Sequence, residues 1–270
     1  MKLFLPVCLF FVVSCGDDNF KKYASLSEFR VLGVVADTPE VSDTNETVSL
    51  TPVLSDIGNE GRTVTMKVES CVDPGIATGE EVNCEGGTLY QLVTEENIDI
   101  NTLLGANYYT GAINSIDITI PENILSDRSP IEQFNGIDYI VTFTFSVGGD
   151  ELLRTFRRIK VSSRPVKNSN PTISSISDIL LSSSEQGLSL VAGESPQEFS
   201  FLDLTGEQKT SKEVYYLSWF TSSGEIESSQ VYVDEETKIT LDSNLPNEAV
   251  VVVFLRDGRG GSDFLVKKLP

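Results

Sequence analysis

The feature that most constrains the fold is a succession of short β-branched runs separated by turn residues. In Thr63–Cys71, the apolar residues Val64, Met66 and Val68 alternate with polar ones, which is the period of a half-buried strand. The same alternation recurs in Ile116–Asn123. No long amphipathic helix interrupts the series. The pattern therefore predicts an all-β protein.

Two pairs of runs predict β-hairpins, because a short glycine-containing turn joins the members of each pair. Tyr139–Val147 and Leu152–Val161 flank a Gly-Gly-Asp turn, and the last two runs of the chain flank Asp257–Gly261. The apolar run Val250–Phe254 is expected to be an interior strand, since an exposed strand of this kind would promote aggregation. Helical turns are expected only in Leu92–Ala106 and in Pro121–Ser129, where the alternation is weakest.

A break in the pattern predicts two domains. The segment Ser162–Pro171 combines Pro, Ser and Asn without apolar periodicity, as interdomain linkers do. About eight short strands follow in roughly a hundred residues, which is typical of an immunoglobulin-type sandwich. Trp219, the only tryptophan, is expected in its core beside Tyr215 and Leu217. We therefore expect two immunoglobulin-like β-sandwich domains, residues 28–162 and 171–270, joined by a linker at residues 163–170.

The N-terminus has the organisation of an export signal that ends in a cysteine. Lys2 precedes the apolar segment Leu3–Val13, which is too short to span a bilayer. The sequence Val12-Val13-Ser14-Cys15 then resembles the lipobox of bacterial lipoproteins. The resemblance implies that Cys15 is acylated and that the signal peptide, residues 1–14, is cleaved. Residues 15–27 would then form a lipidated tether.

Acylation would anchor the protein at a membrane without a membrane-spanning segment. Each buried methylene contributes about 0.8 kcal/mol, so two or three acyl chains anchor a soluble domain effectively permanently. In the lipoproteins that this signal resembles, an Asp directly after the cysteine favours the inner membrane, and here Gly16 occupies that position. The expected location is therefore the outer membrane, facing the periplasm or the cell surface.

The remaining cysteines predict a disulfide. Cys8 would be removed with the signal peptide, which leaves Cys71 and Cys84 as an even pair in an exported chain. A bridge would close a loop rich in glycine and acidic residues and would contribute roughly 3 kcal/mol through loop entropy. Redox or metal chemistry would need a C-x-x-C spacing or further thiols.

Charge and composition exclude several functions. The chain has 40 Asp and Glu against 20 Lys and Arg, a net charge of -20, which disfavours nucleic acid as a partner. It contains no histidine, so Ser-His-Asp and Cys-His mechanisms and imidazole zinc sites are impossible. We assign no catalytic residue, metal ligand or cofactor, and we expect the protein not to be an enzyme.

Two alternatives rest on the abundant carboxylates. A carboxylate-dependent polysaccharide hydrolase would need two acidic groups facing each other across a cleft. A calcium-stabilised adhesion module would bind the ion at loop ends through acidic and backbone oxygens. Asp73, Asp257 and Asp263 are the calcium candidates in this sequence.

A basic stripe stands out against the acidic background. On a strand, Arg154, Arg158 and Lys160 would share one face. We interpret this face as an ordinary outward surface; a surface that pairs with the acidic second domain, or that binds an anionic partner, is the alternative.

Three segments resemble uncharacterised envelope lipoproteins from gliding and predatory bacteria: Arg30–Val41, Ser49–Asp56 and Phe254–Phe264. That group carries immunoglobulin-like or PKD-like β-sandwiches, and many members have a cysteine pair in the first domain. The resemblance implies fold and location without an activity. We expect a non-enzymatic, lipid-anchored binding module or structural spacer that contacts the membrane through its acyl chains and contacts envelope proteins or glycans through its loops.

Overall fold

The strands that the alternation predicts are present and lie in several sheets. The computed structural model describes residues 23–26, 29–57, 63–75, 82, 84, 87–99, 108–180, 184–245 and 249–269. Strands make up most of this part of the chain, and a short helix, α3 (Pro130–Asn135), lies between β7 (Ile116–Thr119) and β8 (Ile137–Val147). The predicted all-β class is therefore confirmed.

The first half of the chain forms two sheets that face each other. One sheet has the order β2-β9-β8-β4-β5, built from β2 (Glu40–Val41), β9 (Asp150–Val161), β8 (Ile137–Val147), β4 (Thr63–Val72) and β5 (Gln91–Asp99). The other contains β1 (Arg30–Ala36), β3 (Thr47–Ile57), β6 (Tyr108–Ala112) and β7 (Ile116–Thr119). The alternating side chains predicted to be buried, Val64, Met66 and Val68, lie between the two sheets.

The second half repeats this arrangement with smaller sheets. Its main sheet has the order β17-β15-β19-β20, built from β17 (Gln230–Tyr232), β15 (Tyr216–Thr221), β19 (Val250–Arg256) and β20 (Ser262–Lys268). Short strands cover one face of it: β10 (Ile173–Ile176), β11 (Glu185–Leu188), β12 (Leu190–Ala192), β16 (Glu225–Ile226) and β18 (Thr237–Thr240). Trp219, Tyr215 and Leu217 are buried between these layers, as the sequence predicts.

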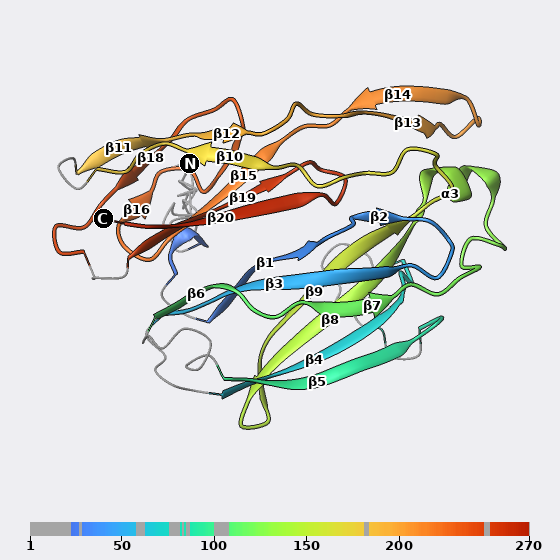
Figure 1. Cartoon of the computed structure of the whole chain (residues 1–270), viewed down its shortest axis with the longest axis horizontal. Coiled ribbons are helices and arrows are strands. Elements are labelled where there is room, and N and C mark those ends of the chain that lie inside the picture. The colour runs from blue at the N-terminus through green and yellow to red at the C-terminus, as the bar shows by residue number, and fades with distance from the viewer. Residues whose placement is uncertain are drawn as a thin grey trace, which may run out of the picture.

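The two halves are packed face to face, so the molecule is a stack of four β-layers (Figure 1). A third apolar cluster joins the two middle layers: Leu26, Leu32, Val53, Phe220, Val250, Val252 and Phe254. Strand β19 packs on both of its faces. Val251 and Val253 face the core of the second half, while Val250, Val252 and Phe254 face the third cluster. A strand buried on both faces needs a continuous apolar run, which confirms the interior position predicted for Val250–Phe254.

Gly33 allows this close approach of the halves. A Cβ built at Gly33 would lie 2.6 Å from a ring carbon of Phe254. The register of β1 against β3 also shifts between Val31 and Gly33. This bulge turns Leu32 toward the third cluster while Val34 stays in the first half's own core.

Both predicted hairpins are confirmed. Strands β8 and β9 pair antiparallel through Val147 and Asp150, and the intervening Gly148 and Gly149 have φ of 61° and 97°, as a type I′ turn requires. Strands β19 and β20 pair from Val250 to Lys268. A further hairpin, β13 (Glu198–Leu202) with β14 (Gln208–Lys212), extends over α3 and is called the arm below.

One of the two segments expected to form helical turns is a strand, and the other forms turns. Residues 92–99 belong to strand β5, which pairs with β4 along its length, because cross-strand pairing overrides a weak helical preference; residues 100–106 lie outside the described residues. The segment 121–129 forms turns, and α3 begins after Ser129. The Ser129 and Glu132 side chains form a capping box there.

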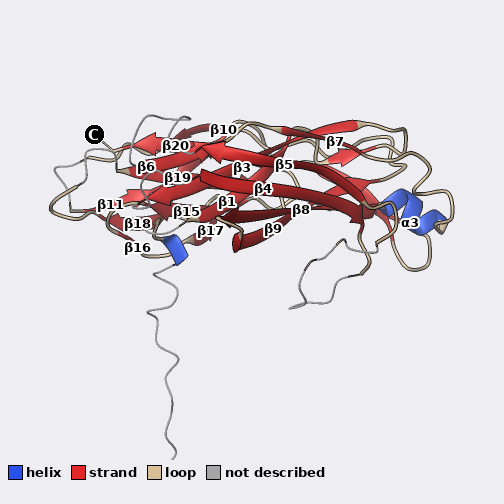
Figure 2. Cartoon of the chain, turned by 90° about the horizontal axis from the view of Figure 1, so that it is seen from below, coloured by secondary structure: helices blue, strands red, loops and turns tan. Residues whose placement is uncertain are grey.

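The first described residues are packed against the second half. Ala24 and Leu26 are buried, and the Leu26 N–H donates to the Thr221 carbonyl of β15 at 2.9 Å. Residues 23–26, which the sequence analysis assigns to the tether, are therefore part of the folded body; residues 1–22, and with them Cys15, lie outside the described residues. No helix within the described ranges is long and apolar enough to cross a membrane. Figure 2 shows α3 at one end of the long axis, well away from this segment.

Candidate functional site

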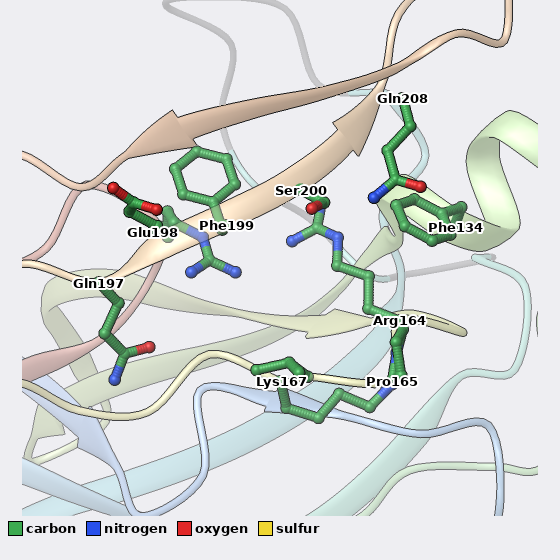
Figure 3. A pocket seen from close by; sticks show the side chains of 11 residues that line it. Phe134, Arg164, Pro165, Lys167, Gln197, Glu198, Phe199, Ser200 and Gln208 are labelled. Carbon is green, nitrogen blue, oxygen red and sulfur yellow. The ribbon is translucent and has the colours of Figure 1, made fainter.

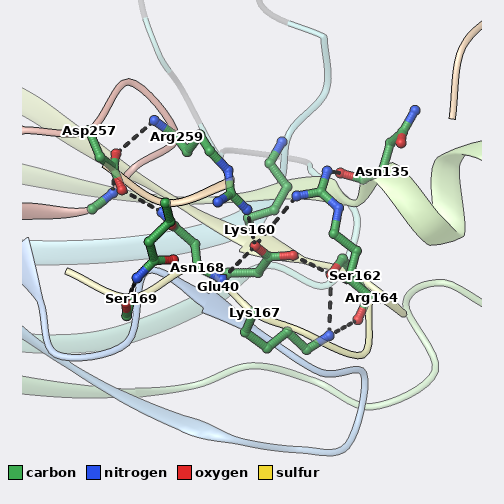
Figure 4. Close-up of polar contacts among 12 residues, drawn as sticks. Glu40, Asn135, Lys160, Ser162, Arg164, Lys167, Asn168, Ser169, Asp257 and Arg259 are labelled. Carbon is green, nitrogen blue, oxygen red and sulfur yellow. Dashed lines mark hydrogen bonds and ion pairs between the residues drawn. The ribbon is translucent and has the colours of Figure 1, made fainter. Parts of the chain in front are cut away.

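A cluster of buried polar side chains lies where the two halves meet (Figure 4). Its members come from β2, from the segment 163–170, from the residue stretch before β15 and from the turn between β19 and β20. We call it the junction cluster: Glu40, Arg164, Asn168, Glu213, Asp257 and Arg259. Together with an adjacent pocket, it is the candidate functional site of the chain.

Glu40 is the central acceptor of the junction cluster. The residue is 1% exposed, and its Oε2 lies 3.2 Å from Arg259 Nη2 and 3.6 Å from Arg164 Nη1. The same oxygen accepts from the Asn168 N–H at 2.9 Å, and Oε1 accepts from the Ser162 hydroxyl. A buried carboxylate is tolerated only when its oxygens are satisfied in this way.

The Arg259 guanidinium joins two of the three carboxylates of the junction cluster, Glu40 and Glu213. Its Nη1 lies 2.9 Å from Glu213 Oε1 while Nη2 reaches Glu40, so one guanidinium bonds a residue of each half. The guanidinium carbon also lies 4.2 Å from the Phe199 ring centroid of the arm. Burial raises the pKa of Glu213, and the hydrogen bonds from Gln197 and Arg259 only partly oppose this.

Asp257 folds the turn that carries Arg259. Its carboxylate accepts from the N–H groups of Arg259 and Gly261 at 2.7 and 2.8 Å, and from the side-chain amide of Asn168 at 2.7 Å. A Cβ at Gly261 would lie 2.2 Å from Asp257 Oδ2, so glycine is required for this closure. From the first half, Arg157 donates to the carbonyl of Gly260. Burial lowers the pKa of Arg157 to about 10 despite nearby Asp257.

The segment 163–170 is bound to both halves. The Asn170 side-chain amide donates to the Ala36 carbonyl at 2.6 Å, and its oxygen accepts from the Ser262 N–H at 2.9 Å. Lys167 Nζ donates to the carbonyl and hydroxyl oxygens of Ser162. Residues 163–170, the expected linker, are therefore held in place by hydrogen bonds to both halves.

A pocket of about 220 Å³ opens beside the junction cluster. Its walls come from α3, from the segment 163–170 and from the arm. The Asn135 side chain holds the arm over α3, because its amide donates to the Leu202 carbonyl at 2.7 Å and its oxygen accepts from the Leu202 N–H at 2.8 Å.

The predicted cysteine pair lies away from this site. Cys71, on β4, and Cys84 form a disulfide with Cα atoms 5.5 Å apart. Both residues are buried, and Ile140 of β8 packs against them. The disulfide is therefore buried in the first half. The predicted lipidation residue, Cys15, lies outside the described residues.

The three calcium candidates do not come together. Asp257 is buried in the junction cluster, Asp263 accepts from the N–H groups of Ile173 and Phe264, and Asp73 pairs with Arg158 at 3.1 Å. Among the residues with described positions, no group of three acidic or cysteine side chains is arranged to hold a metal ion.

The basic stripe is neutralised within the first half. Besides the Arg158–Asp73 pair, Lys160 Nζ lies 2.6 Å from Asp138 Oδ1 and Arg154 Nη2 lies 3.0 Å from Glu151 Oε2. The arginine of β9 that contacts the second half is Arg157, whose position has the opposite parity.

The sequence analysis missed the junction cluster. Glu40 belongs to a two-residue strand, and Arg164 and Asn168 belong to a segment without periodicity, so no local pattern marked them. One signal in the sequence could have been used: in the turn Asp257–Gly261, Arg259 stands between Gly258 and Gly260.

Comparison with known proteins identifies no family. No family model matches the chain, and no curated protein matches it. Among solved structures, the sporulation control protein Spo0M from Bacillus subtilis matches with TM-score 0.27 and 11% identity, covering 90% of each chain. The adhesin InvE from Yersinia pseudotuberculosis matches with TM-score 0.21 and 12% identity, covering 94% of this chain and 61% of the adhesin. At these TM-scores the fold description rests on the chain's own strand pairing.

Proposed function

We propose that this chain is a non-enzymatic, lipid-anchored envelope protein whose two immunoglobulin-like sandwiches act together as one rigid binding module. The observation that carries the proposal is the shared interior of the two halves. An apolar cluster and a buried ion network both cross the junction. Such a body holds its surface loops in fixed relative positions, which suits recognition better than a flexible pair of domains would.

The lipobox-like sequence supports attachment through Cys15. Residues 16–22 separate this cysteine from the first packed residues, and an extended chain of that length spans roughly 25 Å. The body would therefore stay close to the membrane, with the β15 side nearer the anchor. The end that carries α3 and the arm would face a partner (Figure 1).

Fractionation of cells that express a Cys15→Ala variant tests the anchor. We expect the unchanged chain in the outer-membrane fraction and the variant in the soluble fraction, because the alanine cannot be acylated. A Cys8→Ala variant is the matched control and should remain in the membrane. A Cys15→Ala protein that stays in the membrane fraction would contradict the proposal.

A further inference from the structure

The arginines of the pocket beside the junction cluster are already paired. Figure 3 shows Arg164 among the lining residues, and its guanidinium bonds Glu40 and the Asn135 carbonyl. Arg259 pairs with Glu40 and Glu213, so neither guanidinium is available to an anionic ligand. A broader open surface lies on the first half. It is the side of the sheet β2-β9-β8-β4-β5 that points away from the core, and we call it the outer face.

The outer face carries no further layer in the described part of the chain. The opposite side of the same sheet packs on β1, β3 and β7 in the core of the first half, and Figure 1 places the sheet at the margin of the stack. Exposed apolar side chains lie on both flanks of the sheet: Leu152 and Phe156 on β9, and Leu92 on β5 beside Tyr90. Exposed apolar groups gathered on one face mark interaction sites.

One row of paired residues joins the two flanks. Phe156 of β9 pairs with Thr142 of β8. Glu69 of β4 pairs with Thr142 on one side and with Leu92 of β5 on the other. Adjacent strands are about 4.8 Å apart, so Phe156 and Leu92 are separated by roughly 14 Å. Thr142 is buried between them and donates to the Glu69 carbonyl at 3.2 Å. The row is therefore low and polar in the middle, with an exposed apolar side chain at each end.

The described charges of the outer face are balanced, although the chain as a whole has a net charge of -20. Its cations are each paired with a carboxylate: Lys67 with Glu69 at 3.2 Å, Arg154 with Glu151 at 3.0 Å, Arg158 with Asp73 at 3.1 Å and Lys160 with Asp138 at 2.6 Å. Two copies of so acidic a chain repel each other, and the repulsion is weakest where neutral surfaces meet. The outer face is therefore a surface at which a second copy can approach.

We propose that the outer face binds a second copy of this chain, with a twofold axis that runs parallel to the strands between β8 and β4. This axis places β9 of each copy over β5 of the other, and β8 over β4. Phe156 of one copy then contacts Leu92 of the other, and the same contact forms a second time with the roles exchanged. A twofold interface requires such reciprocal contacts, and the row provides them because its two ends are both apolar.

The outer face has the area that a stable dimer needs. Four strands about 4.8 Å apart and roughly 36 Å long cover about 700 Å² per copy, which is close to the roughly 800 Å² per partner of a standard interface. Rotation about an axis parallel to the strands keeps each copy's residues 23–26 at the same position along that axis. Both chains then point the same way, as two chains anchored in one membrane must. The dimer goes beyond the proposed function, and it does not depend on acylation of Cys15.

Sedimentation equilibrium tests the proposal on residues 15–270 carrying Cys15→Ser, which include every described residue. We expect a monomer–dimer equilibrium with Kd on the order of 10 µM. Phe156→Glu and Leu92→Glu should each weaken the dimer by about tenfold or more, because each buries a charge against an apolar side chain. Leu204→Glu is the matched control: it adds the same charge on the arm, where Leu204 is 97% exposed, and it should leave the dimer unchanged.

A double variant tests the reciprocal contact. Phe156→Glu combined with Leu92→Lys places opposite charges against each other between the copies, and should bind about tenfold more tightly than Phe156→Glu alone. Within one copy the two positions are three strands apart and cannot pair. Urea midpoints close to that of the unchanged chain establish that the variants are folded. A monomer at about 200 µM, or equal weakening by Leu204→Glu, would overturn the proposal. A double variant no tighter than Phe156→Glu would overturn the contact between Phe156 and Leu92.

Discussion

At the scale of single residues, the junction depends on how completely Glu40 is satisfied. Removing one partner from a buried ion pair leaves an uncompensated charge, which costs more than the pair contributes. Arg164 and Arg259 both contact the same oxygen of Glu40. Within the junction cluster, Glu40 is therefore the residue whose replacement removes the largest number of side-chain contacts.

Glu40→Gln should lower the free energy of unfolding by about 3 kcal/mol, because two buried guanidinium groups lose their shared carboxylate. Urea denaturation of both proteins measures the difference. Glu185→Gln is the matched control: Glu185 pairs with Lys238 at 2.9 Å but is exposed, so its loss should cost about 1 kcal/mol or less. Equal effects of the two substitutions would contradict the central role of Glu40.

The raised pKa of Glu213 predicts an unusual contribution to the pH dependence of stability. Burial is its main cause, nearby Asp257 adds to it, and the Arg259 hydrogen bond opposes it. The folded state therefore binds the proton of the Glu213 carboxyl more tightly than the unfolded state does. The resulting contribution to the free energy of unfolding is fully present below the usual pKa near 4.5, and it is lost as pH rises through the raised pKa.

Urea midpoints of the unchanged chain and of Glu213→Gln, compared between pH 4 and pH 7, measure this contribution. The difference between the two proteins removes the effect of the other carboxylates. We expect the unchanged chain to lose more stability than the variant as pH rises through this range. Parallel pH profiles would show that burial of Glu213 does not perturb its ionisation.

At the scale of elements, the strands could be predicted from the sequence and the junction could not. Alternation in Thr63–Cys71 and the glycine turn before Asp150 are local signals, so they marked β4 and the β8–β9 hairpin correctly. Arg259 and Glu40 are 219 residues apart, and neither lies in a periodic run. Contacts over such separations depend on the folded arrangement of sheets, which local patterns do not contain.

Gly33 provides a test of the face-to-face packing between β1 and β19. Gly33→Ala should destabilise the protein by about 1–3 kcal/mol, because the added methyl overlaps the Phe254 ring. In a Phe254→Leu background the same substitution should cost about 0.5 kcal/mol or less, since the ring is gone. The double-mutant cycle is measured by urea denaturation. Additive effects would mean that Gly33 and Phe254 do not meet in solution.

At the scale of the whole molecule, the layered stack of sheets makes the two halves interdependent. The second half covers one face of the β1–β3 sheet, and the first half covers one face of β19. Neither half could separate without exposing Leu32, Phe254 and their neighbours to water, at about 25 cal/mol per Å² of apolar surface. This arrangement predicts cooperative unfolding.

Two probes, one in each half, test this cooperativity. Trp219 fluorescence reports on the core of the second half, and amide exchange at Val141 and Phe143 reports on β8 in the first. Both should give the same urea midpoint in the unchanged chain, because opening either half removes the shared layer. Gly33→Ala combined with Glu40→Gln weakens only the junction, so the two midpoints should then separate. Distinct midpoints in the unchanged chain would show that the halves fold independently and that the rigid body does not persist in solution.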